Sequence, residues 1–321
     1  MALFAYTVGG GGAILIGLWE SVTSISESTR GENPLYHSSQ LVENASRSKP
    51  RLTLFSSATT YLLISFLSVL VIVNSLISLF DAVNYKDSMG LALQLQVIPI
   101  ASLFLLFSGL GILSNTTDSF HFPKTILNLI YAFAFGEEFF VFYTKINDPS
   151  GSGVESRYYD LMLVPIAVCL FSTLLEMRST YYAKLGRGIG FISQGMWILQ
   201  MGFSFFTSMI SDGCWLSRRS RGNLSIKCKG HSEYHRGSAI ATLEFNCHLA
   251  VVVSFGVGFY SVLRKVHGME REALKYTPIG ADKTVVHDDN HHQFSLESDD
   301  DENGIGVEMT LKGNVWATAN N

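Results

Sequence analysis

The chain has 321 residues, of which 47% are hydrophobic and only 16% are charged. Because soluble domains carry about 25% charged residues, this composition argues against a soluble domain and indicates the lipid bilayer as the main partner. The formal net charge of −4 is unevenly spread, with acidic residues gathered near the carboxyl terminus. The sequence has no basic stripe with interleaved aromatic residues, so we expect no nucleic-acid partner.

Seven apolar segments are candidates for membrane-spanning helices, which need about 20 residues to cross about 30 Å of hydrocarbon. They cover about residues 3–19, 54–80, 89–113, 123–144, 158–177, 188–210 and 239–263. The sequence therefore predicts an all-α membrane protein, a seven-transmembrane-helix bundle formed by residues 1–266.

The first predicted span, residues 3–19, contains the glycine run Gly9–Gly12. A secretory signal peptide is the alternative, but the segment lacks a basic start and no small-residue cleavage site follows, so we expect a retained helix. Each glycine costs about 1 kcal/mol in helix propensity, and we expect the run to allow close approach to a neighbouring helix. The polar residues 20–53 that follow are predicted to form a loop.

Prolines and glycines mark two of the later spans. Pro99, together with Gly109 and Gly111, predicts a kink in the third span. Pro123 is well placed as a first-turn proline of the fourth span.

Two adjacent carboxylates, Glu137 and Glu138, lie inside the fourth span. A charge at mid-bilayer costs roughly 2.5–3.5 kcal/mol on insertion scales, so something must compensate for them. They are compatible with a polar cavity or cation site, with structural bonds to Ser, Tyr or Gln of adjacent helices, or with a position that water reaches. Since the two side chains are about 100° apart around the helix, they cannot both face one neighbour. The structural interpretation is narrowly favoured.

Glu244 and His248 lie four residues apart in the seventh span and therefore share one helix face. They are compatible with a proton-relay pair or half of a metal site, but we favour a structural bond between helices. With Glu137 and Glu138 they form the candidate intramembrane polar site. No second histidine stands in an obvious partner span, so we predict no metal site and no cofactor.

The polar segment 211–237 contains two cysteines, Cys214 and Cys228. We predict that they form a disulfide. A Cys₂His₂ metal site with His231 and His235 is the alternative, although the spacing fits no standard zinc finger.

The distribution of lysine and arginine slightly favours an amino terminus that is outside or lumenal and a cytoplasmic carboxyl terminus. This orientation places Cys214, Cys228 and the N-glycosylation sequon at Asn223 on the oxidising side of the membrane. The sequence contains no retention signal, so it does not distinguish between the plasma membrane and the endomembranes as the location of the protein.

Residues 267–321 hold few aliphatic side chains and a dense acidic cluster around Ser298. Such a segment cannot bury enough apolar surface to fold, so we predict a disordered acidic cytoplasmic tail. Ser298 precedes four acidic residues and is a candidate phosphorylation site. We expect protein partners, if any, at this tail.

Four segments of the chain carry a family resemblance. They are GEEFFVFYTKINDPSGSGVESRYYDLMLVPI (136–166), QGMWILQMGF (194–203), EFNCHLAVVV (244–253) and, more loosely, GGGGAILIGLW (9–19). In this order and at these separations, they resemble the transmembrane protein 45 family, known in plants as the plant viral-response family. The resemblance covers roughly residues 1–265 and implies a multi-pass membrane protein linked to viral or defence responses.

The chain is a divergent copy of that pattern, because members usually carry histidines at places where this chain does not. The corresponding positions hold Val8 or Gly9, Glu20, Lys145 and Tyr159–Asp160, and of the aligned histidines only His248 is retained. If typical members bind a metal or move protons through those histidines, this chain lacks most of the residues that would do so.

The sequence contains no catalytic triad, P-loop, dinucleotide fingerprint or HExxH motif, so we expect no enzyme activity. The leading hypothesis is a non-enzymatic membrane protein that acts through its loops and tail in membrane trafficking or in stress and viral responses. The alternative is a transporter, channel or proton or metal-ion site in the helix bundle. An interpretation of the chain as a receptor would rest on the number of helices alone. The sequence does not indicate an oligomeric state.

Overall fold

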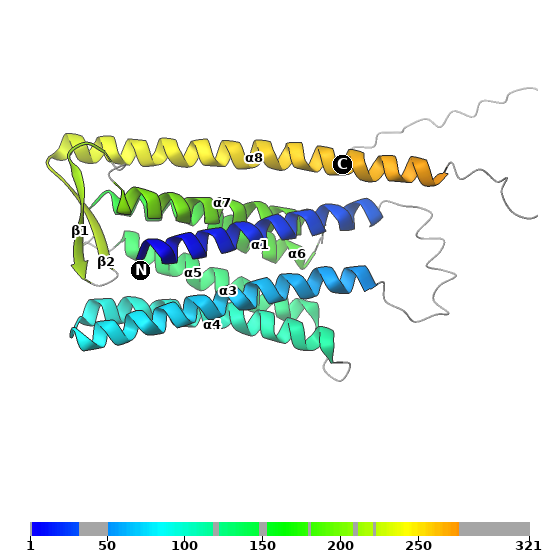
Figure 1. Ribbon diagram of the computed structural model, residues 1–321, viewed down its shortest axis with the longest axis horizontal. Coiled ribbons are helices and arrows are strands. Elements are labelled where there is room, and N and C mark those ends of the chain that lie inside the picture. Colours follow the sequence, from blue (N-terminus) through cyan, green and yellow to red (C-terminus); the bar gives the residue numbers. More distant parts are fainter. Residues whose placement is uncertain are drawn as a thin grey trace, which may run out of the picture. The chain divides into compact units, whose positions relative to one another are not determined.

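The computed structural model describes residues 2–31, 51–117, 122–147, 153–178, 181–207, 211–220 and 223–275. These residues form α1 (Ala2–Gly31), α3 (Arg51–Asn84), α4 (Ser88–Thr116), α5 (Lys124–Ile146), α6 (Glu155–Glu176), α7 (Tyr181–Phe206), β1 (Cys214–Ser220), β2 (Asn223–Cys228) and α8 (His231–Lys275) (Figure 1). In this part of the chain, seven helices are long and apolar enough to cross a membrane. The predicted all-α membrane fold is therefore confirmed. The acidic cluster with Ser298 lies outside the described residues.

Several predicted boundaries are wrong, because the helices continue past the hydrocarbon-length spans. α1 includes residues 20–31, predicted as loop, and α3 already begins at Arg51. α8 includes residues 267–275, predicted as the start of the tail. A helix satisfies its own backbone hydrogen bonds, so polar turns can extend it beyond the apolar stretch that hydropathy detects.

The helix starts of α4 and α5 follow local sequence signals. The side chain of Asp87 accepts a hydrogen bond from the backbone N–H of Gly90 at 3.0 Å, which caps the start of α4. Pro123 immediately precedes the first residue of α5, one position before the predicted first turn. α4 continues through Pro99.

Glycines bring α1 and α7 into close antiparallel contact. A Cβ atom added to Gly10 would lie 2.7 Å from the carbonyl oxygen of Gly195, and one added to Gly17 would lie 2.5 Å from that of Gly188. No side chain fits at these distances, so the two backbones pack directly against each other, as small residues allow in membranes.

The four glycines of the run in α1 have different neighbours. Gly10 faces α7, and a Cβ atom at Gly12 would approach Leu67 of α3 to 2.6 Å. Gly9 and Gly11 would meet nothing within 4 Å. The expected close approach therefore holds for two of the four glycines, and nothing in the structure explains the other two.

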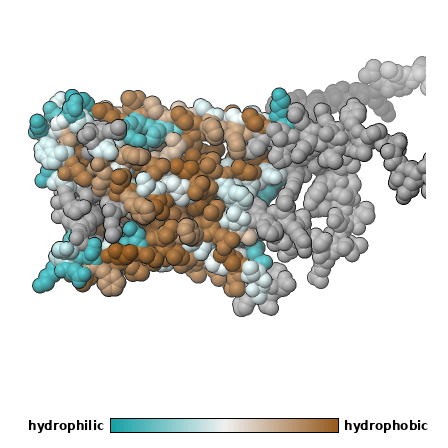
Figure 2. Space-filling model, in the orientation of Figure 1, coloured by the Kyte–Doolittle hydropathy of each residue, from teal (hydrophilic) through white to brown (hydrophobic). Residues whose placement is uncertain are grey.

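Aromatic side chains fill two buried clusters. The first joins residues of α1, α3, α4, α5, α6 and α7, and the rings of Phe107 and Tyr131 stack in it with centroids 4.0 Å apart. The second joins α6, α7 and α8, and in it Tyr158 stacks on the fully buried Trp197 at 5.3 Å. Hydrophobic side chains also cover the middle of the helices on the outside, with hydrophilic ones at the end that carries the hairpin (Figure 2).

The segment between α7 and α8, predicted as a polar loop, contains a β-hairpin. β1 and β2 pair antiparallel with Cys214 opposite Cys228. These two cysteines form a disulfide. α8 begins at His231, so the last residues of the predicted loop are helical.

Candidate functional site

Glu138 bonds α5 to α7. Its Oε1 atom accepts a hydrogen bond from Nε2 of Gln194 at 2.6 Å. On the other side of the amide, Sγ of Cys169 in α6 lies 4.0 Å from Oε1 of Gln194 and 3.8 Å from the backbone carbonyl oxygen of Arg187. A chain of polar contacts thus runs from α5 through α7 to α6.

Glu137 lies about 100° away around the same helix and is exposed. It has no hydrogen bond or ion pair with another residue that the structure describes. The two neighbouring carboxylates therefore differ in their surroundings, because Glu138 is hydrogen-bonded between helices and Glu137 faces away from the bundle.

Glu244 and His248 have separate surroundings in α8. Oε2 of Glu244 accepts a hydrogen bond from the hydroxyl of Tyr158 in α6 at 3.4 Å. The His248 ring meets the Trp197 ring edge-on, with centroids 6.2 Å apart, and its buried Nδ1 atom has no partner among the described residues. No hydrogen bond joins Glu244 to His248 in this part of the chain.

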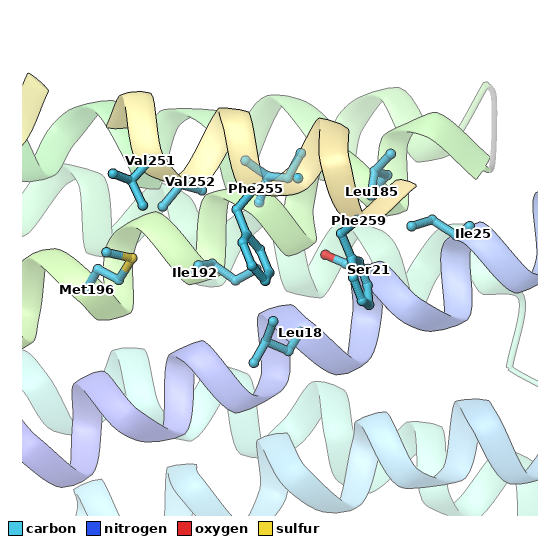
Figure 3. A pocket seen from close by; sticks show the side chains of 12 residues that line it. Leu18, Ser21, Ile25, Leu185, Ile192, Met196, Val251, Val252, Phe255 and Phe259 are labelled. Carbon is cyan, nitrogen blue, oxygen red and sulfur yellow. The ribbon is translucent and has the colours of Figure 1, made fainter. Parts of the chain in front are cut away.

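An apolar cavity of about 160 Å³ lies between α1, α7 and α8. Phe255 and Phe259 reach into it from α8, toward α1 and α7 (Figure 3). Ser21 is a polar residue in the lining, and its hydroxyl already donates to the carbonyl oxygen of Gly17 at 2.8 Å. The cavity offers apolar contact, and none of the four candidate site residues lines it.

A buried ion cluster that the sequence reasoning missed joins three helices. Nε of Arg187 in α7 lies 2.9 Å from Oε2 of Glu20 in α1, and its guanidinium also pairs with Glu176 of α6. The guanidinium lies 5.0 Å from the ring centroid of Tyr131, a cation–π contact. Arg187 and Glu20 are only 5% and 3% exposed, so this cluster is shielded from solvent.

The cluster has unused hydrogen-bonding capacity. Two carboxylates and one guanidinium leave a formal charge of −1 when all are ionised. Oε1 of Glu20 and the hydroxyl of Tyr131 are buried and have no partner among the described residues. Nearby in the sequence, Nζ of Lys184 pairs with Glu27 at 2.8 Å, so α1 and α7 share a second ion pair.

The sequence contained a signal for this cluster. Glu20 follows the first predicted span, Glu176 ends the fifth, and Arg187 precedes the sixth. These three positions fall on the same side of the membrane in a seven-span topology. As loop charges these residues predict no pairing, because a charge at a span boundary is ordinarily solvated.

The hairpin is anchored to α6 by one buried carboxylate. Oε1 of Glu155 accepts from the hydroxyl of Ser225 at 2.7 Å, and Oε2 accepts from the backbone N–H of Ile226 at 2.8 Å. Because Cys214 and Cys228 are joined in a disulfide, their thiolates are not available for the alternative Cys₂His₂ metal site.

The predicted glycosylation position lies at the edge of this hairpin. Asn223 is the first residue of β2 and is paired with Ser220 of β1 in the strand register.

Comparison with curated proteins gives no match to the chain. Residues 124–261 match a family of unknown function (DUF716). This range begins at α5 and includes α6, α7, the hairpin and α8 as far as Ser261, with all four candidate site residues, but it excludes Glu20. The chain is therefore similar to the DUF716 family from its fourth to its seventh membrane span.

Proposed function

We propose that the bundle is a non-enzymatic membrane scaffold that acts through protein contacts. The observation that carries this proposal is the separation of the candidate residues. Glu138 bonds α7, Glu244 bonds α6, and Glu137 faces outward. A transport site would bring such side chains to one opening, whereas single bonds between pairs of helices hold a bundle together.

The buried ion cluster supports the same interpretation. Arg187 reaches carboxylates on two other helices, so it fixes α1, α6 and α7 against one another. A buried charge network of this kind specifies one arrangement of helices, because any other arrangement leaves a charge unpaired in hydrocarbon.

The resemblance to the transmembrane protein 45 family motivates a role in membrane trafficking or in stress and viral responses. The disulfide in the hairpin favours an oxidising compartment for the α7–α8 connection. In this proposal the amino terminus is therefore outside or lumenal, and the tail, as the contact surface for protein partners, is cytoplasmic.

The experiment is a flux measurement with purified full-length protein in phosphatidylcholine vesicles that contain a pH-sensitive dye. We expect no proton flux above that of protein-free vesicles. The Glu138→Gln variant tests the carboxylate that is hydrogen-bonded between α5 and α7, and Glu137→Gln is its matched control on the outer face. Flux in the wild type that Glu138→Gln abolishes and Glu137→Gln retains would overturn the scaffold proposal.

A proton or cation path is the second candidate function, and one observation favours it. Oε1 of Glu20 and the hydroxyl of Tyr131 are buried without a described partner near Arg187. Tyr131→Phe removes that hydroxyl at nearly constant volume and leaves no new unpaired group, so folding should be retained. If the path exists, flux measured as above is lost in Tyr131→Phe and in Glu20→Gln.

A further inference from the structure

The cavity between α1, α7 and α8 requires an apolar occupant. Its volume of about 160 Å³ is close to that of an engineered apolar cavity of about 150 Å³ that binds benzene. Voids of this size are uncommon in packed interiors, because the lining atoms lose their contacts. A buried water needs two to four polar partners. The polar side chain of the lining, Ser21, already donates its hydroxyl proton to the carbonyl oxygen of Gly17.

The cavity opens toward the hydrocarbon of the bilayer. Val251 and Phe255 of α8 line it and are 58% and 64% exposed. Both residues lie within the apolar span of that helix, and Phe255 reaches from α8 toward α1 and α7 (Figure 3). Lipid is the solvent at this depth, so an occupant enters sideways from the bilayer and not from water.

The lining runs along the helices. On α8 it extends from Val251 to Phe259, and on α7 it extends from Leu185 to Met196. At a rise of 1.5 Å per residue, these segments are about 12 and 16 Å long. The volume is small for that length, so the cavity is a narrow slot. Such a slot suits an extended acyl chain better than a rigid ring system.

Basic side chains lie at the end of the slot where α7 begins. Lys184 directly precedes the lining residue Leu185, and its Nζ atom lies 2.8 Å from Oε2 of Glu27 in α1. The Lys184 side chain is 23% exposed, so a lipid headgroup can reach it. On α8, Lys265 is exposed and lies six residues beyond Phe259, which is about 9 Å along the axis. Two ammonium groups and one carboxylate leave a positive charge at this end, and each ammonium group has three donors.

We propose that the slot binds one acyl chain of an anionic phospholipid, whose phosphate lies against Lys184 and Lys265. The chain matches the apolar lining, and the anionic headgroup matches the positive charge at the end of the slot. Basic residues between transmembrane helices on the cytoplasmic side bind anionic headgroups in this way. With the carboxyl terminus in the cytoplasm, as proposed above, the lipid comes from the cytoplasmic leaflet.

This site goes beyond the scaffold proposal and does not depend on it. It uses neither the hydrogen bond of Glu138 nor the ion cluster around Arg187. A sterol also has an apolar body, but its hydroxyl carries no charge and would leave the positive end of the slot without a counter-charge.

The first experiment is native mass spectrometry of purified full-length protein in a neutral detergent, titrated with dioleoylphosphatidylserine or with dioleoylphosphatidylcholine. We expect one phosphatidylserine to bind more tightly than phosphatidylcholine. The Lys184→Gln and Lys265→Gln variants should each weaken phosphatidylserine binding about fivefold and leave phosphatidylcholine binding unchanged. The control is Lys86→Gln, in the exposed turn between α3 and α4, which should bind both lipids like the wild type.

Two glycines of α8 provide a matched pair of variants for the cavity itself. Gly256 lines the cavity, and a Cβ atom added there would lie 3.6 Å from Cδ1 of Ile189, which is an ordinary contact. A Cβ atom added to the exposed Gly258 would meet nothing within 4 Å. Gly256→Leu should therefore fill the slot and abolish the tight binding of phosphatidylserine, whereas Gly258→Leu should retain it.

Four results overturn the proposal. The wild type can bind neither lipid, or the two leucine variants can bind phosphatidylserine equally well. The lysine variants can keep the full preference for phosphatidylserine. Tighter binding of added cholesterol than of phosphatidylserine, lost in Gly256→Leu, would assign the cavity to a sterol instead.

Discussion

The bundle buries carboxylates in two regions and stabilises them in two different ways. Glu20 and Glu176 depend on the guanidinium of Arg187, which comes from a third helix. Glu155, at the start of α6, depends on a hydroxyl and on the backbone N–H of Ile226 in the hairpin. The first region loses its compensating charge when one side chain is removed. In the second region, removal of the carboxylate leaves only neutral donors without a partner. A single substitution should therefore lower the stability of the two regions by different amounts.

The largest effect is expected for Arg187→Met. The methionine fills much of the same volume but leaves two buried carboxylates without a counter-charge, and breaking a buried ion pair in this way costs about 3–5 kcal/mol. The measurement is the free energy of unfolding of the full-length protein, by sodium dodecyl sulfate titration in mixed micelles.

The triple variant Glu20→Gln, Arg187→Met, Glu176→Gln is the control, because it removes all three charges together. It should recover most of the loss, since replacing a complete buried ion cluster is often nearly neutral. If the triple variant is as unstable as Arg187→Met, the cluster does not hold the helices through its charges, and the contrast between the two regions fails.

The number and order of the membrane helices could be predicted from the sequence, because a span is a local property of about 20 apolar residues. The ion cluster could not, because a hydropathy window counts Arg187 as a charge at a boundary and does not register a partner on another helix. For the same reason, the sequence alone does not distinguish the surroundings of Glu137 from those of Glu138. Both are adjacent glutamates in one apolar segment, and only the packing of α5 against α7 shows that one is bonded to Gln194.

The hairpin shows a different limit of sequence reasoning. The pairing of Cys214 with Cys228 was predicted, but the segment around them was assigned to a loop. Its strands depend on their register and on the anchor at Glu155, which stands 70 residues away from Ser225 in the sequence. Such a contact gives no periodic signal in either segment.

Loss of the disulfide is expected to have the next largest effect. The cysteines are 14 residues apart, and closing a loop of about this length contributes about 3 kcal/mol in the chain-entropy model. In a Cys214→Ala, Cys228→Ala variant the hairpin should open locally. Trypsin should then cut more rapidly at the exposed Lys227 and Lys229 in intact micelles.

The helix bundle is the internal control for this experiment. Helices α1 and α7 lie outside the hairpin and do not contain either cysteine, so cleavage within them should stay at the wild-type rate. Unchanged cleavage at both lysines would show that the Glu155 anchor alone closes the hairpin.

The smallest effect, and the sharpest test of the second region, is expected for Glu155→Ala. This change leaves the buried hydroxyl of Ser225 and the N–H of Ile226 without an acceptor, which costs about 1–3 kcal/mol. Glu155→Gln is the matched control, because its amide oxygen accepts from Ile226 while its NH₂ group donates to the Ser225 hydroxyl, which can rotate. The rate at which tris(2-carboxyethyl)phosphine reduces the Cys214–Cys228 disulfide reports the opening of the hairpin. We expect it to rise about fivefold or more in Glu155→Ala and to change little in Glu155→Gln. Equal acceleration in both variants would mean that the carboxylate charge holds the hairpin, and the two regions would then be stabilised in the same way.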